Sequence, residues 1–358
     1  MFFVFKNEVF MKKKCAIVGA TGFGGLGLLE ILTRHPELEA TQLFARKETG
    51  IKINDIFPSL TGFYDYEVKD LSEIDYDSID IAFFSTPDQA GMEIIKPFFE
   101  RNIPVVDFSG DFRFNTVEEY KIYAENKSMV PEHKSPELLK HSVYGLPELN
   151  REKIKNAKIV GNPGCFAISM ILASIPLTEL GLIKKGTLVA DSKSGVSGAG
   201  KNPGAANFYP QRHENVNTYR EGRHQHLVEV ENMINLKNNG HKLFFIPQVI
   251  PISRGILSNV YADPSSKISS EELFSAFSDY YKDSPFVRVT SKSPNLSDVR
   301  GSNFCIIRPF FDERTGKILV TSIIDNLMKG QSGNAIQNAN IMLGFEETAG
   351  IMVPGNFP

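Results

Sequence analysis

A cysteine follows a turn of glycine, asparagine and proline in the stretch KIVGNPGCFAISMIL, residues 158–172. The apolar residues after Cys165 predict a helix that begins close to this cysteine. A helix N-terminus carries partial positive charge and free N–H groups, which stabilise a thiolate and a nearby oxyanion. We therefore predict that Cys165 is an ionised nucleophile, with its backbone N–H and Asn162 as oxyanion donors. Cys15 and Cys305 lie inside predicted strands, where a free cysteine is typically a small buried hydrophobe.

A thiolate nucleophile needs a proton partner, and the segment YREGRHQHLVEVE, residues 219–231, contains two histidines. His224 or His226 could act as the acid/base, and Glu229 follows three residues after the second. A His-x-His pair could also bind a metal, and histidines are often structural. No other cluster of ligand residues accompanies this pair, so the sequence predicts no metal site.

A glycine-rich turn, GATGFGG, joins an apolar segment to an amphipathic helical stretch. The spacing of Gly19, Gly22 and Gly25 is typical of a strand–turn–helix unit whose N–H groups approach a dinucleotide pyrophosphate. Arg46 and Lys47 stand where an acidic residue would bind a ribose 2′-OH, so NADP is favoured over NAD. The alternatives are a turn without a ligand and two solvated surface charges.

Several cations could receive an anionic substrate, although each could also be a solvated surface charge. The candidates are Arg113, Lys193, Lys201, Arg223 and Arg254. The predicted substrate-binding set comprises Arg113, Asn162, Lys193, His226, Glu229 and Arg254.

Composition defines the kind of protein that carries these residues. A chain of 358 residues exceeds what one hydrophobic core usually supports, so two domains are expected. Lys plus Arg number 39 against 42 Asp plus Glu and form no basic block, which disfavours nucleic-acid binding. The chain has no run of eighteen apolar residues, which disfavours membrane insertion. Three cysteines without a CxxC pair disfavour disulfides and a cysteine zinc site, and indicate a reducing, cytoplasmic location. The expected partners are small molecules.

The chain is predicted to be α/β, with a Rossmann-type dinucleotide-binding domain followed by an α+β domain with a mainly antiparallel sheet. Buried parallel strands are expected at 40–47, 80–86 and 103–110, with a charged helical stretch at 88–101. Longer strands that can pair antiparallel are expected at 187–194, 242–251 and 255–263, with a hairpin at 303–326. The predicted domains are 11–160, joined by the C-terminal helical segment 330–358, and 161–329; residues 1–10 are predicted to be a loose extension. In the last helix one face, formed by Ala335, Ile336, Ala339, Met342 and Leu343, is expected to pack back on the first domain.

Eight motifs stand in the order found in one enzyme family. They are GATGFGG, FSGDFR, YGLPE, GNPGCF, SGVSGAG, the H-x-H-x-x-E of His224, His226 and Glu229, PISRGI, and NLMKGQSGNAIQNANIMLGFEETAG. Nearly the whole chain from Met11 thereby resembles N-acetyl-γ-glutamyl-phosphate reductases of arginine biosynthesis, within the aspartate-semialdehyde-dehydrogenase-like enzymes.

The resemblance implies that Cys165 is the nucleophile, His224 the preferred acid/base with His226 as the alternative, and Glu229 a substrate-site residue. It implies attack of the thiolate on an acyl phosphate, loss of phosphate, reduction of the thioester by NADPH and release of a semialdehyde, in a homodimer or homotetramer. The full set of predicted cofactor-binding residues is Gly19, Thr21, Gly22, Phe23, Gly25, Arg46, Lys47, Ser85, Pro87, Ser194, Gly195 and Asn326.

The chain departs from the family pattern in two places. Ala167, Ile168 and Ser169 follow the cysteine motif where the family usually has a small residue or proline, threonine, and glycine or alanine. Gln225 and Val228 replace an arginine and a proline of the histidine segment. These changes leave open the shape of the substrate pocket and the acyl group it accepts. The alternatives are a sister acyl-phosphate reductase, such as aspartate-semialdehyde dehydrogenase or an aminoadipyl-phosphate reductase, and a non-catalytic NADP-binding regulator.

Overall fold

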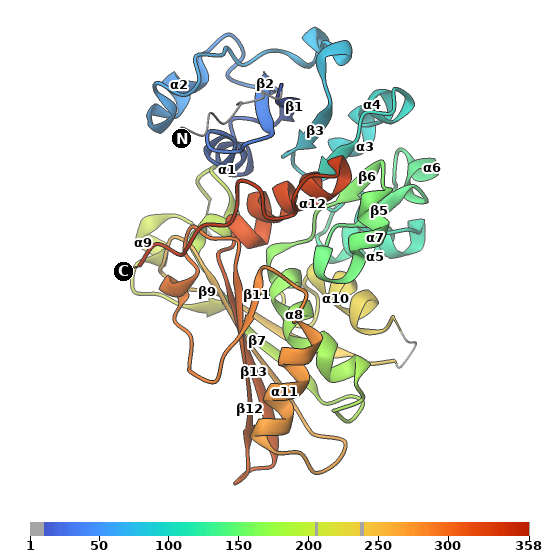
Figure 1. Cartoon of the computed structure of the whole chain (residues 1–358), viewed down its shortest axis with the longest axis vertical. Helices are drawn as coiled ribbons and strands as arrows, with labels where there is room; N and C mark the ends of the chain where they lie inside the picture. The colour runs from blue at the N-terminus through green and yellow to red at the C-terminus, as the bar shows by residue number, and fades with distance from the viewer. Residues whose placement is uncertain (1–10, 205–206, 237–239, 358) are drawn as a thin grey trace, which may run out of the picture.

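Two β-sheets organise the chain, whose computed structural model describes residues 11–204, 207–236 and 240–357. The first sheet is built from the N-terminal part of the chain and the second from the C-terminal part, and they lie at opposite ends of the molecule (Figure 1). The predicted loose extension, residues 1–10, lies outside the described residues.

The first sheet is entirely parallel. Its order is β2 (Leu38–Phe44), β1 (Lys13–Val18), β3 (Ile81–Phe84), β4 (Val105–Asp107), β6 (Ile159–Gly161) and β5 (Ser142–Tyr144). The three strands predicted from apolar runs are confirmed as β2, β3 and β4. Their central residues, such as Phe83 and Val106, are buried because parallel strands in an α/β protein are covered on both faces.

Helices connect these parallel strands. They are α1 (Phe23–Leu32), α2 (Ile53–Ile56), α3 (Gly91–Ile94), α4 (Lys96–Glu100), α5 (Val117–Asn126), α6 (Pro136–Leu139) and α7 (Pro147–Lys155). The stretch predicted to be helical at 88–101 is divided into α3 and α4. Pro97 has no backbone N–H to continue the hydrogen bonds of α3, so a new short helix begins beside it.

The second sheet is mixed and mainly antiparallel. Its order is β11 (Val287–Val289), β12 (Cys305–Asp312), β13 (Lys317–Ile324), β10 (Ile256–Ala262), β7 (Leu188–Ser194), β9 (Leu243–Val249) and β8 (Asn217–Thr218). The predicted hairpin is confirmed as β12–β13, and β10 is antiparallel to both β13 and β7. β7 and β9 instead pair in parallel, because the chain between them crosses back through a helix before β9 begins.

One face of the second sheet is covered and the other is open. Helices α8 (Cys165–Glu179), α10 (His226–Ile234) and α11 (Ser270–Tyr280) contact the sheet, and α9 (Tyr209–Arg212) lies in the connection before β8. The strands alternate buried and accessible residues, as expected for a sheet with one packed face. Paired residues of β9, β7, β10, β13 and β12 form an apolar row on the open face: Phe244, Val189, Tyr261, Leu319 and Phe310.

The chain returns to the first sheet at its end. A π turn, η6 (Met328–Ser332), follows β13 and leads into α12 (Gly333–Leu343). α12 contacts α1, α7 and β4, and Figure 1 shows it in red between the two sheets. Its buried side includes Ala335, Ile336 and Ala339, so the helix packs against elements of the first sheet and its connections. Five 3₁₀ turns complete the described part of the chain, at Pro58–Leu60, Leu71–Glu73, Tyr76–Ser78, Val196–Ala199 and Leu296–Asp298.

Candidate active site

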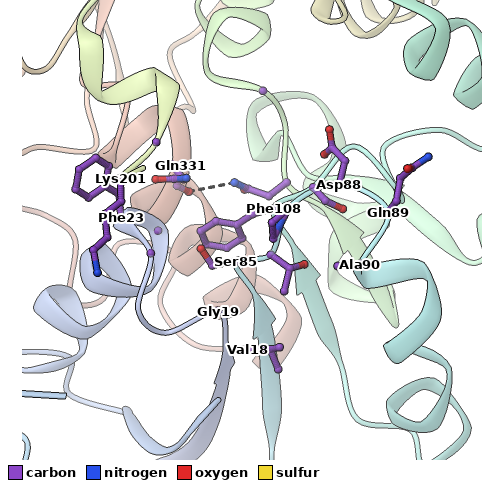
Figure 2. A pocket seen from close by; sticks show the side chains of 18 of the residues that line it. Val18, Gly19, Phe23, Ser85, Asp88, Gln89, Ala90, Phe108, Lys201 and Gln331 are labelled. Carbon is purple, nitrogen blue, oxygen red and sulfur yellow. Dashed lines mark hydrogen bonds between the residues drawn. The ribbon is translucent and has the colours of Figure 1, made fainter. Parts of the chain in front are cut away.

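A cavity of about 1040 Å³ lies between the glycine-rich loop and the N-terminus of α8. Figure 2 shows residues of both parts of the chain around it, including Ser85, Asp88, Phe108 and Gln331. Most of the predicted site residues line this cavity. They are Gly19, Thr21, Gly22, Phe23, Arg46, Lys47, Ser85, Pro87, Arg113, Asn162, Cys165, His226 and Asn326.

Cys165 is the first residue of α8, where the sequence predicts it. Gly164 precedes the helix in an extended conformation and offers no side-chain cap, so the N–H groups of the first turn are left without one. Burial nevertheless raises the pKa of the Cys165 thiol to about 11, although the backbone N–H of Phe166 and the Arg113 charge act to lower it. The resting sulfur is therefore a thiol at neutral pH, which differs from the predicted thiolate and means that a base has to remove its proton.

The two histidines occupy different places. His226 is the first residue of α10 and lines the cavity, and its ring lies so close to Gly164 that a Cβ there would approach His226 Nε2 to 2.2 Å. His224 is absent from the described cavity lining; its ring packs edge-on against Phe166 and Phe245, and its Nδ1 accepts a hydrogen bond from the backbone N–H of His226 at 3.2 Å. Burial lowers the pKa of both imidazoles well below the ordinary value, so both are neutral. The geometry thus favours His226 over the preferred candidate, His224, because His226 lines the same cavity as Cys165.

Glu229 lies behind the cavity and not in its described lining. Its carboxylate accepts hydrogen bonds from Arg113 Nη1 at 2.9 Å, from Tyr144 Oη at 3.0 Å and from the Gly164 backbone N–H at 3.0 Å. Both side chains of the ion pair with Arg113 are almost completely buried. The structure therefore places the Glu229 carboxylate where it holds the turn that presents Cys165, and its contact with substrate stays a prediction.

Arg113 is both part of the cavity wall and part of this network. Its Nε donates to the backbone oxygen of Asn162 at 2.8 Å and its Nη2 to that of Phe108 at 2.6 Å. Burial lowers the pKa of Arg113, but the acidic groups around it, Glu229 first among them, together outweigh burial and the net shift is upward. The guanidinium stays charged and rigid, and it can direct its remaining N–H groups to an anion in the cavity.

Asn162 also lines the cavity, but its side chain is largely engaged. Its Oδ1 accepts from Asn334 Nδ2 at 2.7 Å and from Asn338 Nδ2 at 3.2 Å, and its Nδ2 donates to the backbone oxygen of Gln331 at 3.1 Å. A primary amide carries two N–H groups, so one donor of Nδ2 is left for a ligand. Asn162 thereby connects the cysteine turn to the segment that leads into α12.

Two predicted substrate-binding cations lie elsewhere. Lys193 is on the open face of β7, where it pairs with Asp191 at 2.6 Å, because its neighbours Ser192 and Ser194 occupy the buried positions of the alternating strand. Arg254 pairs with Asp325 at 3.1 Å and lines a separate cavity of about 420 Å³. The structure does not bring either side chain to Cys165.

Three predicted cofactor-binding residues are also outside the described lining of the main cavity. Gly25 serves packing inside the turn, since a Cβ there would lie 2.4 Å from the Ala20 oxygen. Ser194 is buried, and a Cβ on Gly195 would lie 2.8 Å from the Ser253 oxygen. The cavity wall in this region is formed instead by residues 197–202, which follow them in the same motif.

The glycine-rich loop fits a dinucleotide phosphate. Gly19 has a φ of +86°, and a Cβ there would lie 2.3 Å from the Ser85 oxygen, so only glycine allows the loop to approach β3 this closely. Gly22 begins α1 without a side-chain cap, which leaves the N–H groups of its first turn available to an anion. Thr86 Oγ1, Gln331 Oε1 and His226 Nδ1 are buried in the cavity wall without a partner among the described residues. A large polar ligand would satisfy these groups.

Cations gather at the far end of the loop. Arg46 and Lys47 are exposed and follow β2 at the cavity edge, as predicted. Lys201, labelled in Figure 2, comes from the second part of the chain. Its ammonium donates to the Thr21 oxygen at 3.2 Å. Its ammonium also lies 3.4 Å from Glu48, so this cation belongs to the dinucleotide end of the cavity and not to the cysteine end.

Sequence reasoning missed several cavity residues. Asp88 and Gln89 follow β3, and Lys127 ends α5. Asp88 pairs with Lys127 and accepts a hydrogen bond from the Gly110 N–H at 2.8 Å. Burial raises the pKa of Asp88, but Lys127, Arg113 and the Gly110 N–H together outweigh burial and the net shift is downward. The position of Asp88 after a parallel strand was a usable signal. Lys127 gave no such signal, because a lysine on a charged helix is expected to be a solvated surface residue.

The departures from the family pattern lie partly in the packing of α8 and α10 and partly in the cavity wall. Ile168 and Ser169 are buried, and Ser169 Oγ bonds Ser258 Oγ at 2.9 Å and Ser322 Oγ at 3.2 Å, so these residues pack α8 on the second sheet. Gln225 lines the cavity, whereas Val228 is buried in α10. Only the change at 225 therefore reaches the cavity directly.

Two general features of the described residues bear on function. Within 11–204, 207–236 and 240–357, no three His, Cys, Asp or Glu side chains gather as a metal site. In the same ranges, each helix is too short or too polar to cross a bilayer.

Two domain matches show the class of protein to which this fold and site belong, the semialdehyde-dehydrogenase-like enzymes. Residues 14–157 match the family model of the semialdehyde dehydrogenase NAD binding domain, and residues 165–326 match that of the semialdehyde dehydrogenase dimerisation domain. The chain belongs, more closely, to the family of N-acetyl-γ-glutamyl-phosphate reductases. It is 41% identical over 350 residues to the N-acetyl-γ-glutamyl-phosphate reductase of Geotalea daltonii, covering 96% of this chain and 99% of that one. The Bacillus mycoides protein of the same name is 39% identical over 345 residues, covering 94% and 98%.

Solved structures share the fold at lower identity. Aspartate semialdehyde dehydrogenase II from Vibrio cholerae superposes with a TM-score of 0.70 at 19% identity, covering 94% of this chain and 99% of that one. The aspartate semialdehyde dehydrogenase of Candida albicans, solved with NADP, superposes with a TM-score of 0.69 at 18% identity, covering 93% and 99%. This similarity confirms the predicted α/β fold class with two parts.

Proposed function

We propose that the chain catalyses the NADPH-dependent reductive dephosphorylation of N-acetyl-γ-glutamyl phosphate to N-acetylglutamate γ-semialdehyde, in arginine biosynthesis. The observation that carries the proposal is that one cavity is lined both by Cys165, at the start of α8, and by the glycine-rich loop that fits a dinucleotide phosphate. A sulfur that forms a thioester beside a reductant is what the reduction of an acyl phosphate requires.

The reaction begins with removal of the Cys165 proton and attack of the sulfur on the γ-carbonyl carbon. The C–S bond forms, the C–O bond to phosphate breaks, and the leaving phosphate faces Arg113 in the cavity wall. NADPH, when bound, supplies the hydride that reduces the thioester carbonyl. The backbone N–H groups at the start of α8 stabilise the negative oxygen of the resulting thiohemiacetal. The C–S bond then breaks, the aldehyde leaves and Cys165 is ready for protonation.

We infer that His226 is the acid/base of this sequence. It lines the cavity beside Gly164, and its Nδ1 has no partner among the described residues. As a neutral imidazole it can accept the proton of Cys165, and as the imidazolium it can return that proton to the Cys165 sulfur when the C–S bond breaks. His224, whose Nδ1 accepts the backbone N–H of His226, holds the start of α10 in place.

NADP is the cofactor. The 2′-phosphate is assigned to Arg46 and Lys47 and the pyrophosphate to the loop from Gly19 to Phe23. Ser85 and Pro87 after β3, and Asn326 after β13, are assigned to the remainder of the dinucleotide.

We propose further that residues 11–160 with 330–358 form one domain, that 161–329 form the other, and that the enzyme is a cytoplasmic homodimer or homotetramer. The separate sheets and the return of α12 support the division. The apolar row that contains Phe244 and Tyr261 on the open face of the second sheet supports self-association, because both side chains are substantially exposed in the single chain. Sedimentation of Phe244→Asp beside the parent protein tests this part.

Replacement of the nucleophile tests the chemistry. Cys165→Ser should bind NADPH normally and lose phosphate-dependent turnover of the semialdehyde, whereas the control Cys305→Ser, buried in β12, should keep both. Incubation with acyl phosphate and no dinucleotide should add the acyl mass to the peptide that contains Cys165. Turnover in Cys165→Ser would refute the proposal.

A substrate panel tests the assignment within the superfamily. Rates with N-acetylglutamyl, N-succinylglutamyl, aspartyl and aminoadipyl phosphates should differ in kcat/KM, with the N-acetylglutamyl compound highest and NADPH preferred over NADH. A higher value for another compound would transfer the chain to a sister reaction and leave the thioester mechanism intact.

A further inference from the structure

The π turn η6 contacts two parts of the cavity at once. Ser332 Oγ donates to the Gly24 oxygen of α1 at 3.0 Å, on the dinucleotide side. On the cysteine side, a Cβ on Gly330 would lie 2.8 Å from Cys165 Cβ, and the Gln331 oxygen accepts the Asn162 amide. The turn therefore touches both α1, which follows the loop assigned to the cofactor, and the residue assigned as nucleophile. Wide π turns are rare and occur frequently at functional sites.

The turn is anchored from behind by a buried lysine. Lys329 is fully buried and is not among the residues that line the cavity. Its ammonium donates to Glu148 Oε1 at 2.7 Å, to Gln337 Oε1 at 2.8 Å and to Asn334 Oδ1 at 3.1 Å. An ammonium has three donors, and all three are satisfied. Glu148 belongs to α7, so this one side chain ties the turn to α7 and α12.

A second anchor holds the beginning of the turn. Asp325 Oδ1 accepts the backbone N–H of Leu327 at 2.8 Å, and the Asp325 backbone oxygen accepts the N–H of Gly330 at 2.9 Å. The turn is thus held by Asp325, which precedes it, and by Lys329, its second residue, and Lys329 is not among the residues that line the cavity.

Stability alone is a weak reason for such an anchor. A buried ion pair is often no more stabilising than apolar residues of similar size, because both charges lose their hydration. What the pair provides is a single position for the turn: Lys329 can satisfy its three donors in one arrangement only.

We propose that Lys329 is a positioning residue, and that the turn it anchors sets the distance between the Cys165 sulfur and the bound dinucleotide. The inference rests on the proposed reduction, but it also concerns the cofactor-free protein, where the turn still contacts Cys165. Displacing the turn moves Gly330 off Cys165 and Ser332 off Gly24, so it changes the surroundings of the thiol and its alignment with the cofactor together.

The test compares Lys329→Met/Glu148→Gln, which removes both buried charges, with Arg151→Met. Arg151 pairs with Glu347 at 2.6 Å, also between α7 and the C-terminal segment, but does not touch the turn. The double variant should melt within a few degrees of the parent, lose at least about tenfold in kcat, and show a several-fold change in the rate of Cys165 alkylation by iodoacetamide without NADP. Arg151→Met should change none of these.

A milder variant keeps the inference testable if the double variant does not fold. Ser332→Ala removes only the hydrogen bond to Gly24, and NADP should then protect Cys165 from alkylation at least severalfold less well than in the parent. The inference is overturned if the double variant folds and has the kcat and the alkylation rate of the parent. If the double variant is unfolded, the inference is overturned when NADP protects Cys165 as well in Ser332→Ala as in the parent. Absence of reductase activity in the parent would instead refute the proposed function, since the alkylation comparison does not depend on turnover.

Discussion

Replacement of Glu229 by glutamine should destabilise the protein far more than an ordinary loss of one carboxylate. Glu229 balances the buried charge of Arg113 and accepts three hydrogen bonds. Glutamine has one oxygen, so its NH₂ group has to face either Arg113 or the pair formed by Gly164 and Tyr144. Burial and the Glu229 charge raise the pKa of Tyr144 well above its usual value, so its hydroxyl stays a donor next to the native carboxylate.

The expected size follows from burial. Removing one partner of a buried ion pair costs about 3–5 kcal/mol, because the other charge is left without compensation. For a cooperative unit of about 150–250 residues, this corresponds to a decrease of roughly 6–20 °C in melting temperature. Glu231→Gln is the matched control, since it lies on the same helix but pairs with Lys242, which is 79% exposed. An exposed pair is worth about 0–1 kcal/mol.

Thermal unfolding followed by circular dichroism measures both variants. The double variant Arg113→Met/Glu229→Gln should recover more than half of the stability lost in Glu229→Gln, because no buried charge then lacks a partner. A melting temperature for Glu229→Gln within about 3 °C of that for Glu231→Gln would refute the argument, as would a double variant less stable than the single one.

Three further outcomes follow from the described contacts and charges. With a thiol pKa of about 11, the rate of Cys165 alkylation in the cofactor-free protein should rise continuously from pH 7 to pH 10; a plateau below pH 8 would show that the thiolate is already stabilised. Arg46→Ser should weaken NADPH binding by about 10–100-fold and leave NADH binding unchanged, measured by fluorescence titration, since a charge-assisted hydrogen bond contributes about 1.5–3 kcal/mol. Burial and the neighbouring Asp111 raise the pKa of Asp107 from 3.8 to about 8, so its contribution to stability is present at low pH and is lost as the pH rises towards 8. Between pH 5 and pH 8 the melting temperature should therefore fall more in the parent than in Asp107→Asn. Equal dependence of the two melting temperatures on pH would contradict this.

Local patterns explain why much of the fold could be predicted from the sequence. Apolar runs and the glycine-rich turn determine the strands and α1, because burial on both faces and a positive φ at Gly19 are properties of a few neighbouring residues. The same holds for Cys165, whose helix is signalled by the apolar residues that follow it. The parallel pairing of β7 with β9 could not be predicted in this way, because it depends on where a connection of more than forty residues returns.

The choice between His224 and His226 shows a second limit. The two residues are two positions apart, and α10 begins at the second, so a short stretch of backbone decides which ring faces the cavity. His224 packs against Phe166 and Phe245, which are distant in sequence. Lys193 was a different case: the alternation of β7 places it on the face opposite to the buried Ser192 and Ser194, and that signal was present in the sequence.

Buried charge was the feature least visible in the sequence and most informative in the structure. Glu229 and Lys329 belong to recognised motifs, and a charged residue in a motif suggests contact with a ligand. Both are instead buried one layer behind the cavity, where they hold Gly164 and Gly330, two residues next to Cys165 that have no side chain of their own. Glycine is required at both positions, since a Cβ would collide with His226 or with Cys165. Glycine backbone that approaches a nucleophile this closely has no side chain to position it, so charged groups behind it have to position it through hydrogen bonds. A charged motif residue next to such a glycine should therefore be tested first for a positioning role and only then for contact with substrate.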